Sequence, residues 1–353
     1  MNGGATAAER GRQATGPGRT GTADGEASRG EASRGEGAAG TALLTVSHLS
    51  GAFRTAHGEE TQVLRDVSFE VPSGGITAIV GETGSGKSLT ALTVMGLCPP
   101  RLSVEGSVRF DGHELLGLDE DGYRRLRGGQ IAMVFQDARS SLNPVLTVGR
   151  QLGDVARLHH GVNKKAAAAM VAETLARVRI PDPVRRMAQY PHQFSGGMAQ
   201  RAMIAMALLC RPRMMLLDEP TTGLDVTTQA DVMELVVELA RQDGLTACLV
   251  THDLGVVGET CDRVVVMRHG TVVEQAAAQD FFRSPKADYS RMLLAANRLD
   301  GGTDPVDADD SSEAADAGDA VGADAGDAAG ADAVDAGDAG TDTAQADDAG
   351  RPS

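Results

Sequence analysis

The central part of this chain carries short apolar runs separated by longer amphipathic or loop-like segments. Leu43 to Val46 predicts a strand, and so does Val63 to Val71, where VLRDVSFEV alternates apolar and polar residues as on a half-buried sheet. Five other segments are short, mostly apolar runs, which predict strands that are buried on both faces. These runs are Ile76 to Val80, Ile131 to Phe135, Met214 to Leu217, Ala247 to Val250 and Arg263 to Met267.

Helical patterns lie between these runs. Helices are predicted at Ser88 to Leu97, within 148–178 and at Gln229 to Arg241; KKAAAAMVAETLARV in the second region is rich in strong helix formers. Strands that alternate with helices predict an α/β domain with a mostly parallel sheet covered on both faces. The helical block at about 140–200 interrupts this alternation and predicts an inserted subdomain.

Both ends of the chain differ from its middle in composition. Residues 1–40 consist mainly of Gly, Ala, Ser, Thr, Arg and Glu, and residues 299–353 alternate Ala, Gly and Asp. Neither segment offers an apolar face to bury, so we expect a disordered N-terminal extension and a disordered acidic tail. A solvating appendage is the simpler explanation of the tail, and an acidic interaction arm is the alternative. The folded region is then 41–298.

The net charge of −16 comes almost entirely from the tail. From Asp300 onward the sequence contains 15 Asp, one Glu and a single Arg. The residues before Asp300 therefore carry a net charge of only about −1. A nearly neutral body argues against a nucleic-acid footprint. The four cysteines are scattered without a CxxC pair, as expected for free thiols in a reducing compartment. No secretory signal and no transmembrane run is apparent, so a membrane role would require partner proteins.

A glycine-rich loop follows the first buried run. It reads Gly81-Glu-Thr-Gly-Ser-Gly-Lys-Ser88 and fits the phosphate-binding pattern G-x-x-x-x-G-K-[ST] between a strand and a helix. Its backbone N–H groups are expected to face phosphate oxygens at the helix N-terminus. Lys87 would reach the β- and γ-phosphates, and the Ser88 hydroxyl would ligate Mg²⁺. Taken alone, this loop predicts a nucleotide site and no more.

The strand at Met214 to Leu217 ends in two carboxylates, Asp218 and Glu219. It delivers Asp218 to the phosphate end of the sheet, where a carboxylate can hold Mg²⁺. The adjoining Glu219 can orient and deprotonate an attacking water. An ordinary strand that ends in an acidic turn would look similar, but the upstream phosphate loop favours a hydrolytic site.

A second potential anion-binding helix start occurs in Phe194-Ser-Gly-Gly-Met-Ala-Gln-Arg201, at Ser195 to Gly197. A single chain that binds one triphosphate needs only one such anion-binding site, so a second site in the same chain has no function there. Two chains packed head to tail do, because each can close the site of the other.

With this segment the chain resembles the ATP-binding subunits of ABC transporters, whose signature loop reads SGGQ or a near variant. The resemblance covers about 42–298. It implies a P-loop NTPase (RecA-like) core with an antiparallel β subdomain and an inserted α-helical subdomain. Gln136 matches the family's Q-loop residue, and His252 matches its switch histidine. Phe53 lies where the family stacks an aromatic ring on adenine, although core packing would explain a lone Phe equally well.

The resemblance assigns further residues by position. Those expected to bind ATP are Phe53, Gly81, Glu82, Thr83, Gly84, Ser85, Gly86, Lys87, Ser88 and Leu89. Those expected to act in catalysis are Lys87, Gln136, Glu219 and His252, and those expected at Mg²⁺ are Ser88, Gln136 and Asp218. The signature residues, which would act on a partner's ATP, are Ser195, Gly196, Gly197, Met198, Ala199 and Gln200, followed by the D-loop residues Gly223, Leu224 and Asp225.

Longer segments narrow the resemblance to the oligopeptide, dipeptide and nickel importer branch. They are QDARSSLNPVLTVG (136–149), YPHQFSGGMAQR (190–201), DEPTTGLDVT (218–227), THDLGVV (251–257) and SPKADYSRMLL (284–294). The last lies in a C-terminal extension at about 276–298, and SLTALTVMGL is similar to the first of the branch's two ATPase subunits. Gly223 replaces the usual Ala, and Ala138-Arg139 often reads Pro-Met in this branch. The cysteine cluster that many relatives carry after the extension is missing, so we expect no iron–sulfur cluster.

The resemblance implies an ATP-hydrolysing importer subunit on the cytoplasmic face of the cell membrane. Its expected partners are two transmembrane permease subunits, a second and unlike ATPase subunit, and an extracytoplasmic solute-binding protein. The permeases would bind the surface formed by 136–147. Peptides, nickel, other metal chelates and some sugars are all compatible cargoes. The alternatives are a soluble ABC-type ATPase, a non-hydrolysing regulatory subunit, which the intact carboxylates and His252 disfavour, and an exporter subunit.

Overall fold

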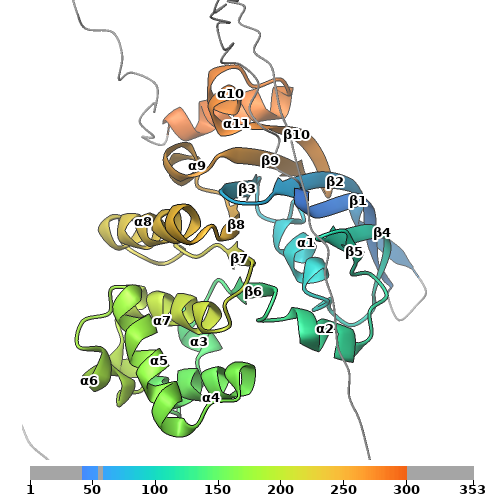
Figure 1. Cartoon of the computed structure of the whole chain (residues 1–353). Helices are drawn as coiled ribbons and strands as arrows, with labels where there is room; N and C mark the ends of the chain where they lie inside the picture. The colour runs from blue at the N-terminus through green and yellow to red at the C-terminus, as the bar shows by residue number, and fades with distance from the viewer. Residues whose placement is uncertain (1–41, 55–58, 300–353) are drawn as a thin grey trace, which may run out of the picture. The chain divides into compact units, whose positions relative to one another are not determined.

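The computed structural model describes residues 42–54 and 59–299 (Figure 1). The predicted disordered extension at 1–40 lies outside the described residues, and so does the predicted tail at 299–353 except for Leu299, which ends a helix. Among the residues that are described, no helix is long and apolar enough to cross a membrane.

A six-stranded sheet forms the centre of the fold, in the order β10-β9-β3-β8-β7-β6. Its strands are β3 (Ile76–Val80), β6 (Ile131–Val134), β7 (Met214–Asp218), β8 (Thr246–Thr251), β9 (Arg263–Arg268) and β10 (Thr271–Ala277). Every predicted buried run is confirmed as a strand, and these strands pair in parallel. The antiparallel edge strand β10 was not predicted, because TVVEQAA mixes polar and apolar residues without a clear period.

A four-stranded antiparallel sheet lies beside the first, in the order β2-β1-β4-β5. Its strands are β1 (Ala42–Arg54), β2 (Glu60–Pro72), β4 (Leu102–Phe110) and β5 (His113–Glu114). The prediction of a strand at Leu43 to Val46 is therefore much too short, because β1 continues to Arg54. Pairing with both β2 and β4 keeps the chain extended to Arg54, across bulges that interrupt the alternation of side chains.

The helices include α1 (Lys87–Val94), which follows the glycine-rich loop and is shorter than predicted. It ends where Gly96 takes a positive φ of 62° against the Tyr123 ring. The remaining helices before β7 are α2 (Glu120–Leu126), α3 (Ala138–Ser141), α4 (Val148–His160), α5 (Lys164–Arg177), α6 (Pro183–Met187), the 3₁₀ turn η1 (Pro191–Gln193) and α7 (Gly196–Leu209). Those after it are α8 (Val226–Asp243), α9 (Leu254–Thr260), α10 (Ala278–Arg283) and α11 (Asp288–Leu299).

Alternate residues of the central strands enter different layers of the core. In β7, Met214 and Leu216 pack with α1 and the antiparallel sheet, whereas Met215 and Leu217 pack with helices α3 to α8. A third cluster joins β3 and β9 to α9, α10 and α11. The central sheet is thus covered on both faces, as predicted. Its strands direct the segments after β3, β7 and β8 to one edge, where ligands bind in open α/β sheets.

Candidate ATP-binding and catalytic site

The loop between β3 and α1 has the backbone shape of a phosphate cradle. Gly81, Gly84 and Gly86 have φ values of 150°, 84° and 103°, which side chains other than glycine rarely adopt. A Cβ atom on Gly81 would lie 2.1 Å from the carbonyl oxygen of Met267. The loop can therefore approach β9 this closely only with glycine at its first position.

Two side chains inside this loop are arranged for an anion. The Nζ of Lys87 donates to the carbonyl oxygens of Gly81 at 2.7 Å and Glu82 at 3.0 Å, and burial lowers the pKa of this ammonium. The Ser85 hydroxyl is buried without a hydrogen-bond partner among the described residues. An unpaired buried hydroxyl is costly, and a partly desolvated ammonium is stabilised by a nearby anion, so both groups suit the oxygens of a bound phosphate.

A hydroxyl and a carboxylate meet at the start of α1 and the end of β7. The Ser88 Oγ donates to Asp218 Oδ1 at 2.8 Å, and burial raises the pKa of this carboxyl. Oxygen ligands of this kind fit Mg²⁺, which takes one or two protein ligands and completes its shell with water and phosphate. In the described chain, no three His, Cys, Asp or Glu residues cluster as a metal site.

Three polar side chains at this edge of the sheet contact the carboxylate of Glu219. Its carboxylate accepts from Gln136 Nε2 and Thr222 Oγ1, both at 2.9 Å, and lies 3.2 Å from His252 Nδ1. Its backbone has a positive φ of 46°, and its N–H donates to Val250 at 2.8 Å. A carboxylate fixed in this way can accept a proton from a water molecule beside the phosphate loop.

The signature residues form the first turn of α7. Ser195 caps this helix by accepting from the Met198 N–H at 3.2 Å. A Cβ on Gly197 would lie 2.2 Å from Thr228 Cγ2, so the first turns of α7 and α8 are in close contact. The D-loop residue Asp225 caps α8 through the Thr228 N–H. Ala199 and Gln200 are buried behind this turn.

Other predicted ligands lie at the margin of this site. Phe53 is half-buried near the end of β1, opposite Thr61 and Leu102, and its stacking on adenine stays a prediction. Leu89 packs partly buried against the core, whereas Thr83 is exposed on the outer side of the loop.

Two residues near the site were missed from the sequence. Thr222 contacts Glu219 from the turn after β7, and it could have been identified from its place in PTTGLD. Tyr289 of α11 accepts a hydrogen bond from the Glu82 N–H at 3.3 Å. Since 207 residues separate this pair, no local pattern indicates it.

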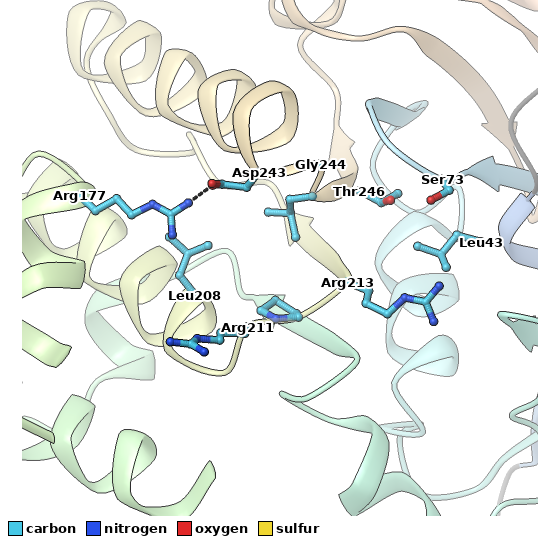
Figure 2. A pocket seen from close by; sticks show the side chains of 11 residues that line it. Leu43, Ser73, Arg177, Leu208, Arg211, Arg213, Asp243, Gly244 and Thr246 are labelled. Carbon is cyan, nitrogen blue, oxygen red and sulfur yellow. Dashed lines mark ion pairs between the residues drawn. The ribbon is translucent and has the colours of Figure 1, made fainter. Parts of the chain in front are cut away.

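A separate pocket lies at the amino ends of β7 and β8, and Asp218, at the other end of β7, does not line it (Figure 2). Arg177 forms an ion pair there with Asp243, and Arg213 donates to Asp111 at 2.5 Å. Because these two arginines are neutralised by carboxylates and the glycine-rich loop follows the opposite end of the sheet, the pocket is not the phosphate site.

Comparison with known proteins supplies the family. The family model described as "ABC transporter" matches residues 64–222. A probable peptide ABC transporter ATP-binding protein of Sinorhizobium fredii is 49% identical over 256 residues, covering 71% of this chain and 76% of that protein. The oligopeptide transport ATP-binding protein OppD of Escherichia coli is 47% identical, covering 73% and 77% of the two chains. The dipeptide transport protein DppD of Bacillus subtilis is 46% identical, covering 71% and 76%.

Solved structures agree with these relatives. A dimeric ATP-binding cassette in a post-hydrolysis state with ADP and Pi superposes with a TM-score of 0.60 at 28% identity, covering 67% of this chain and 99% of that one. The ABC transporter component cbiO1 of Clostridium perfringens gives 0.59 at 27% identity, covering 73% and 96%. The P-loop fold with its antiparallel subdomain is the architecture predicted from the sequence. This chain therefore belongs to the ABC transporter family, as an ATP-binding subunit that hydrolyses ATP.

Proposed function

We propose that this chain drives the uptake of peptides, or a related small solute, as the ATPase subunit of an importer. The observation that carries the proposal is its identity of 44–49% to curated peptide-transport ATP-binding proteins over most of their length. The hydrogen bonds that hold Glu219 support hydrolysis rather than nucleotide binding alone. An exporter or a soluble ATPase would leave this likeness unexplained.

Different residues of the site would bind the phosphates, Mg²⁺ and the adenine of Mg·ATP. Lys87 would hold the β- and γ-phosphates, with the loop's N–H groups from Gly84 to Ser88 around them. Ser88 and Asp218 would hold Mg²⁺, with Gln136 beside them; when bound, Mg²⁺ neutralises charge on the phosphate oxygens. Phe53 is the candidate contact for adenine.

In hydrolysis, Glu219 would take a proton from the attacking water, which Gln136 and His252 help to orient. Both side chains already contact its carboxylate. Proton transfer of this kind requires a donor and acceptor within hydrogen-bond reach, which the fixed position of Glu219 favours.

The signature residues would complete the site of a partner ATPase. In the described ranges they make no hydrogen bond to the phosphate loop of their own chain, and Ser195 is exposed. A head-to-tail pair, with two permease subunits and an extracytoplasmic binding protein, fits this arrangement. We place the chain on the cytoplasmic face of the membrane, expect the second ATPase to be an unlike chain, and expect no iron–sulfur cluster or nucleic-acid partner.

Uptake measurements test the transport role. Cells that lack the gene should take up a labelled peptide slowly, and the wild-type chain should restore the rate while Glu219→Gln does not. The export of a preloaded peptide serves as the control. If Glu219→Gln changed efflux and left uptake intact, the importer assignment would be wrong.

A further inference from the structure

The C-terminal helix α11 reaches the outer side of the phosphate loop. Tyr289, in its first turn, is 5% exposed, and its hydroxyl accepts from the Glu82 N–H at 3.3 Å. Glu82 is the second residue of the loop, directly before the segment that faces phosphate. The last helix of the described residues thus contacts the loop of the proposed nucleotide site.

The Tyr289 ring is held on two sides. The Arg268 guanidinium lies over it, with its Cζ 4.6 Å from the ring centroid, as in cation–π contacts. The apolar cluster formed by β3, β9, α9 and α10 surrounds the ring, with Phe281 fully buried within it. Burial also raises the pKa of Tyr289, so its hydroxyl stays neutral at physiological pH. The ring therefore has little freedom to move away from the loop.

Helix α11 itself is fixed by a buried carboxylate. Glu274 in β10 is 8% exposed and accepts from the N–H groups of Lys286 and Ala287, both at 2.9 Å. These residues directly precede α11, so the two bonds fix the point where the helix begins. Such charge-assisted bonds are stronger than neutral ones.

The hairpin between β9 and β10 supports the next part of the loop. The Gly270 N–H donates to the Ser85 carbonyl at 3.0 Å, and the Met267 carbonyl lies against Gly81. Together with Tyr289, these contacts hold the loop at Gly81, Glu82 and Ser85.

We propose that Tyr289 is a positioning residue that holds the phosphate loop in its binding conformation through the Glu82 N–H. In this role it acts through the backbone of the loop and not on the reacting atoms. A loop fixed before ATP arrives loses less conformational freedom on binding, so the hydroxyl contributes to affinity. The proposal rests on the assignment of this loop to ATP.

The test removes one oxygen atom. Tyr289→Phe keeps the ring but leaves the Glu82 N–H without this acceptor. Tyr123→Phe is the matched control: Tyr123 is 8% exposed and its hydroxyl donates to the Leu115 carbonyl at 2.9 Å, with no contact to the loop. Mg·ATP binding is measured by calorimetry on the full chain, and kcat and KM on the complex with its partners, below the melting range of every variant.

We expect the Kd and KM of Tyr289→Phe for ATP to rise about 2- to 10-fold, the effect of one lost hydrogen bond, with kcat changed less than about twofold. Amide exchange in 81–86 should become faster. Tyr123→Phe should bind ATP like the wild type. Equal Kd values for Tyr289→Phe and wild type, or equal weakening in both variants, would overturn the positioning role. Failure of the wild type itself to bind ATP would instead refute the proposed function.

Discussion

At the scale of single residues, the site depends on charged groups held before any ligand is present. Glu219 has three side-chain neighbours and a backbone conformation that non-glycine residues rarely adopt. Lys87 and Asp218 are both buried, with pKa values displaced in the directions that disfavour their charges. Groups of this kind are typical of functional sites.

Replacing Glu219 should separate binding from hydrolysis. Glu219→Gln keeps the shape of the side chain and can still meet Gln136 and His252, but it cannot accept a proton from water. We expect turnover to fall by about 100-fold or more, the usual contribution of a general base. ATP affinity should stay within a few-fold of the wild type. Equal ATP hydrolysis by the variant and the wild type would contradict the base assignment.

Lys87→Ala should reduce ATP binding, the property that Glu219→Gln is expected to retain. Loss of the ammonium removes charge-assisted bonds to phosphate, so we expect ATP to bind about 10- to 100-fold more weakly. Lys164→Ala, at an exposed lysine that begins α5, is the control and should bind normally. Unaltered ATP affinity in Lys87→Ala would show that this lysine does not hold the phosphates.

The buried Asp218 predicts a pH dependence of Mg·ATP binding. Its pKa lies above the ordinary value of 3.8, chiefly because of burial. As the pH falls, this carboxyl therefore protonates before an exposed Asp would, and Mg·ATP affinity should drop. Conversely, the stability that it contributes to the free protein is present at low pH and is lost as the pH rises through its folded pKa.

Titrations of the wild type and Asp218→Asn between neutral and acidic pH check this dependence. ATP without Mg²⁺ serves as the control for protonation of the nucleotide itself. An identical pH profile in both proteins would exclude Asp218 as the titrating ligand.

At the scale of elements, helices α7 and α8 join the signature turn to the D-loop. Gly197 packs on Thr228, and Arg201 of α7 binds Asp231 of α8 at 2.8 Å. Arg179, after α5, donates to Glu234 and Glu238 of the same helix. These contacts join the helical region to α8, and we expect them to couple the signature turn to the D-loop.

Gly197→Ala tests this contact. A methyl group there must displace Thr228, so we expect a loss of about 1–3 kcal/mol in unfolding free energy and slower ATP turnover by the assembled complex. ATP binding by the isolated chain should be unaffected, because we propose that the signature residues act on the partner's nucleotide. Gly153→Ala in α4, where the new Cβ meets nothing within 4 Å, should stabilise the chain by up to about 1 kcal/mol. Equal turnover in Gly197→Ala and Gly153→Ala complexes would contradict the proposed coupling.

The central sheet was predictable because each of its parallel strands is a short apolar run bounded by loop residues. The phosphate loop was predictable because its glycines and Lys87 are consecutive in the chain. The strands β4 and β10 and helix α11 were not predicted individually, since their burial depends on neighbours far away in sequence. For the same reason the hydrogen bond from Glu82 to Tyr289 could not be foreseen.

At the scale of the whole molecule, the described chain carries one phosphate loop and one signature turn that do not contact each other by hydrogen bonds. In the proposed function, each would be completed by a complementary half from another chain. The exposed Val145 and Val184 of the helical region, at 75% each, are compatible with further protein contacts. The proposed function thus involves a multi-subunit assembly at the membrane.

The most direct test is co-purification of the tagged full chain from gently solubilised native membranes, with its partners identified by mass spectrometry. The account predicts two permease subunits and a second, unlike ATPase in stoichiometric amounts. Recovery with soluble partners alone, without any permease, would leave the ATP chemistry standing and contradict the role in transport.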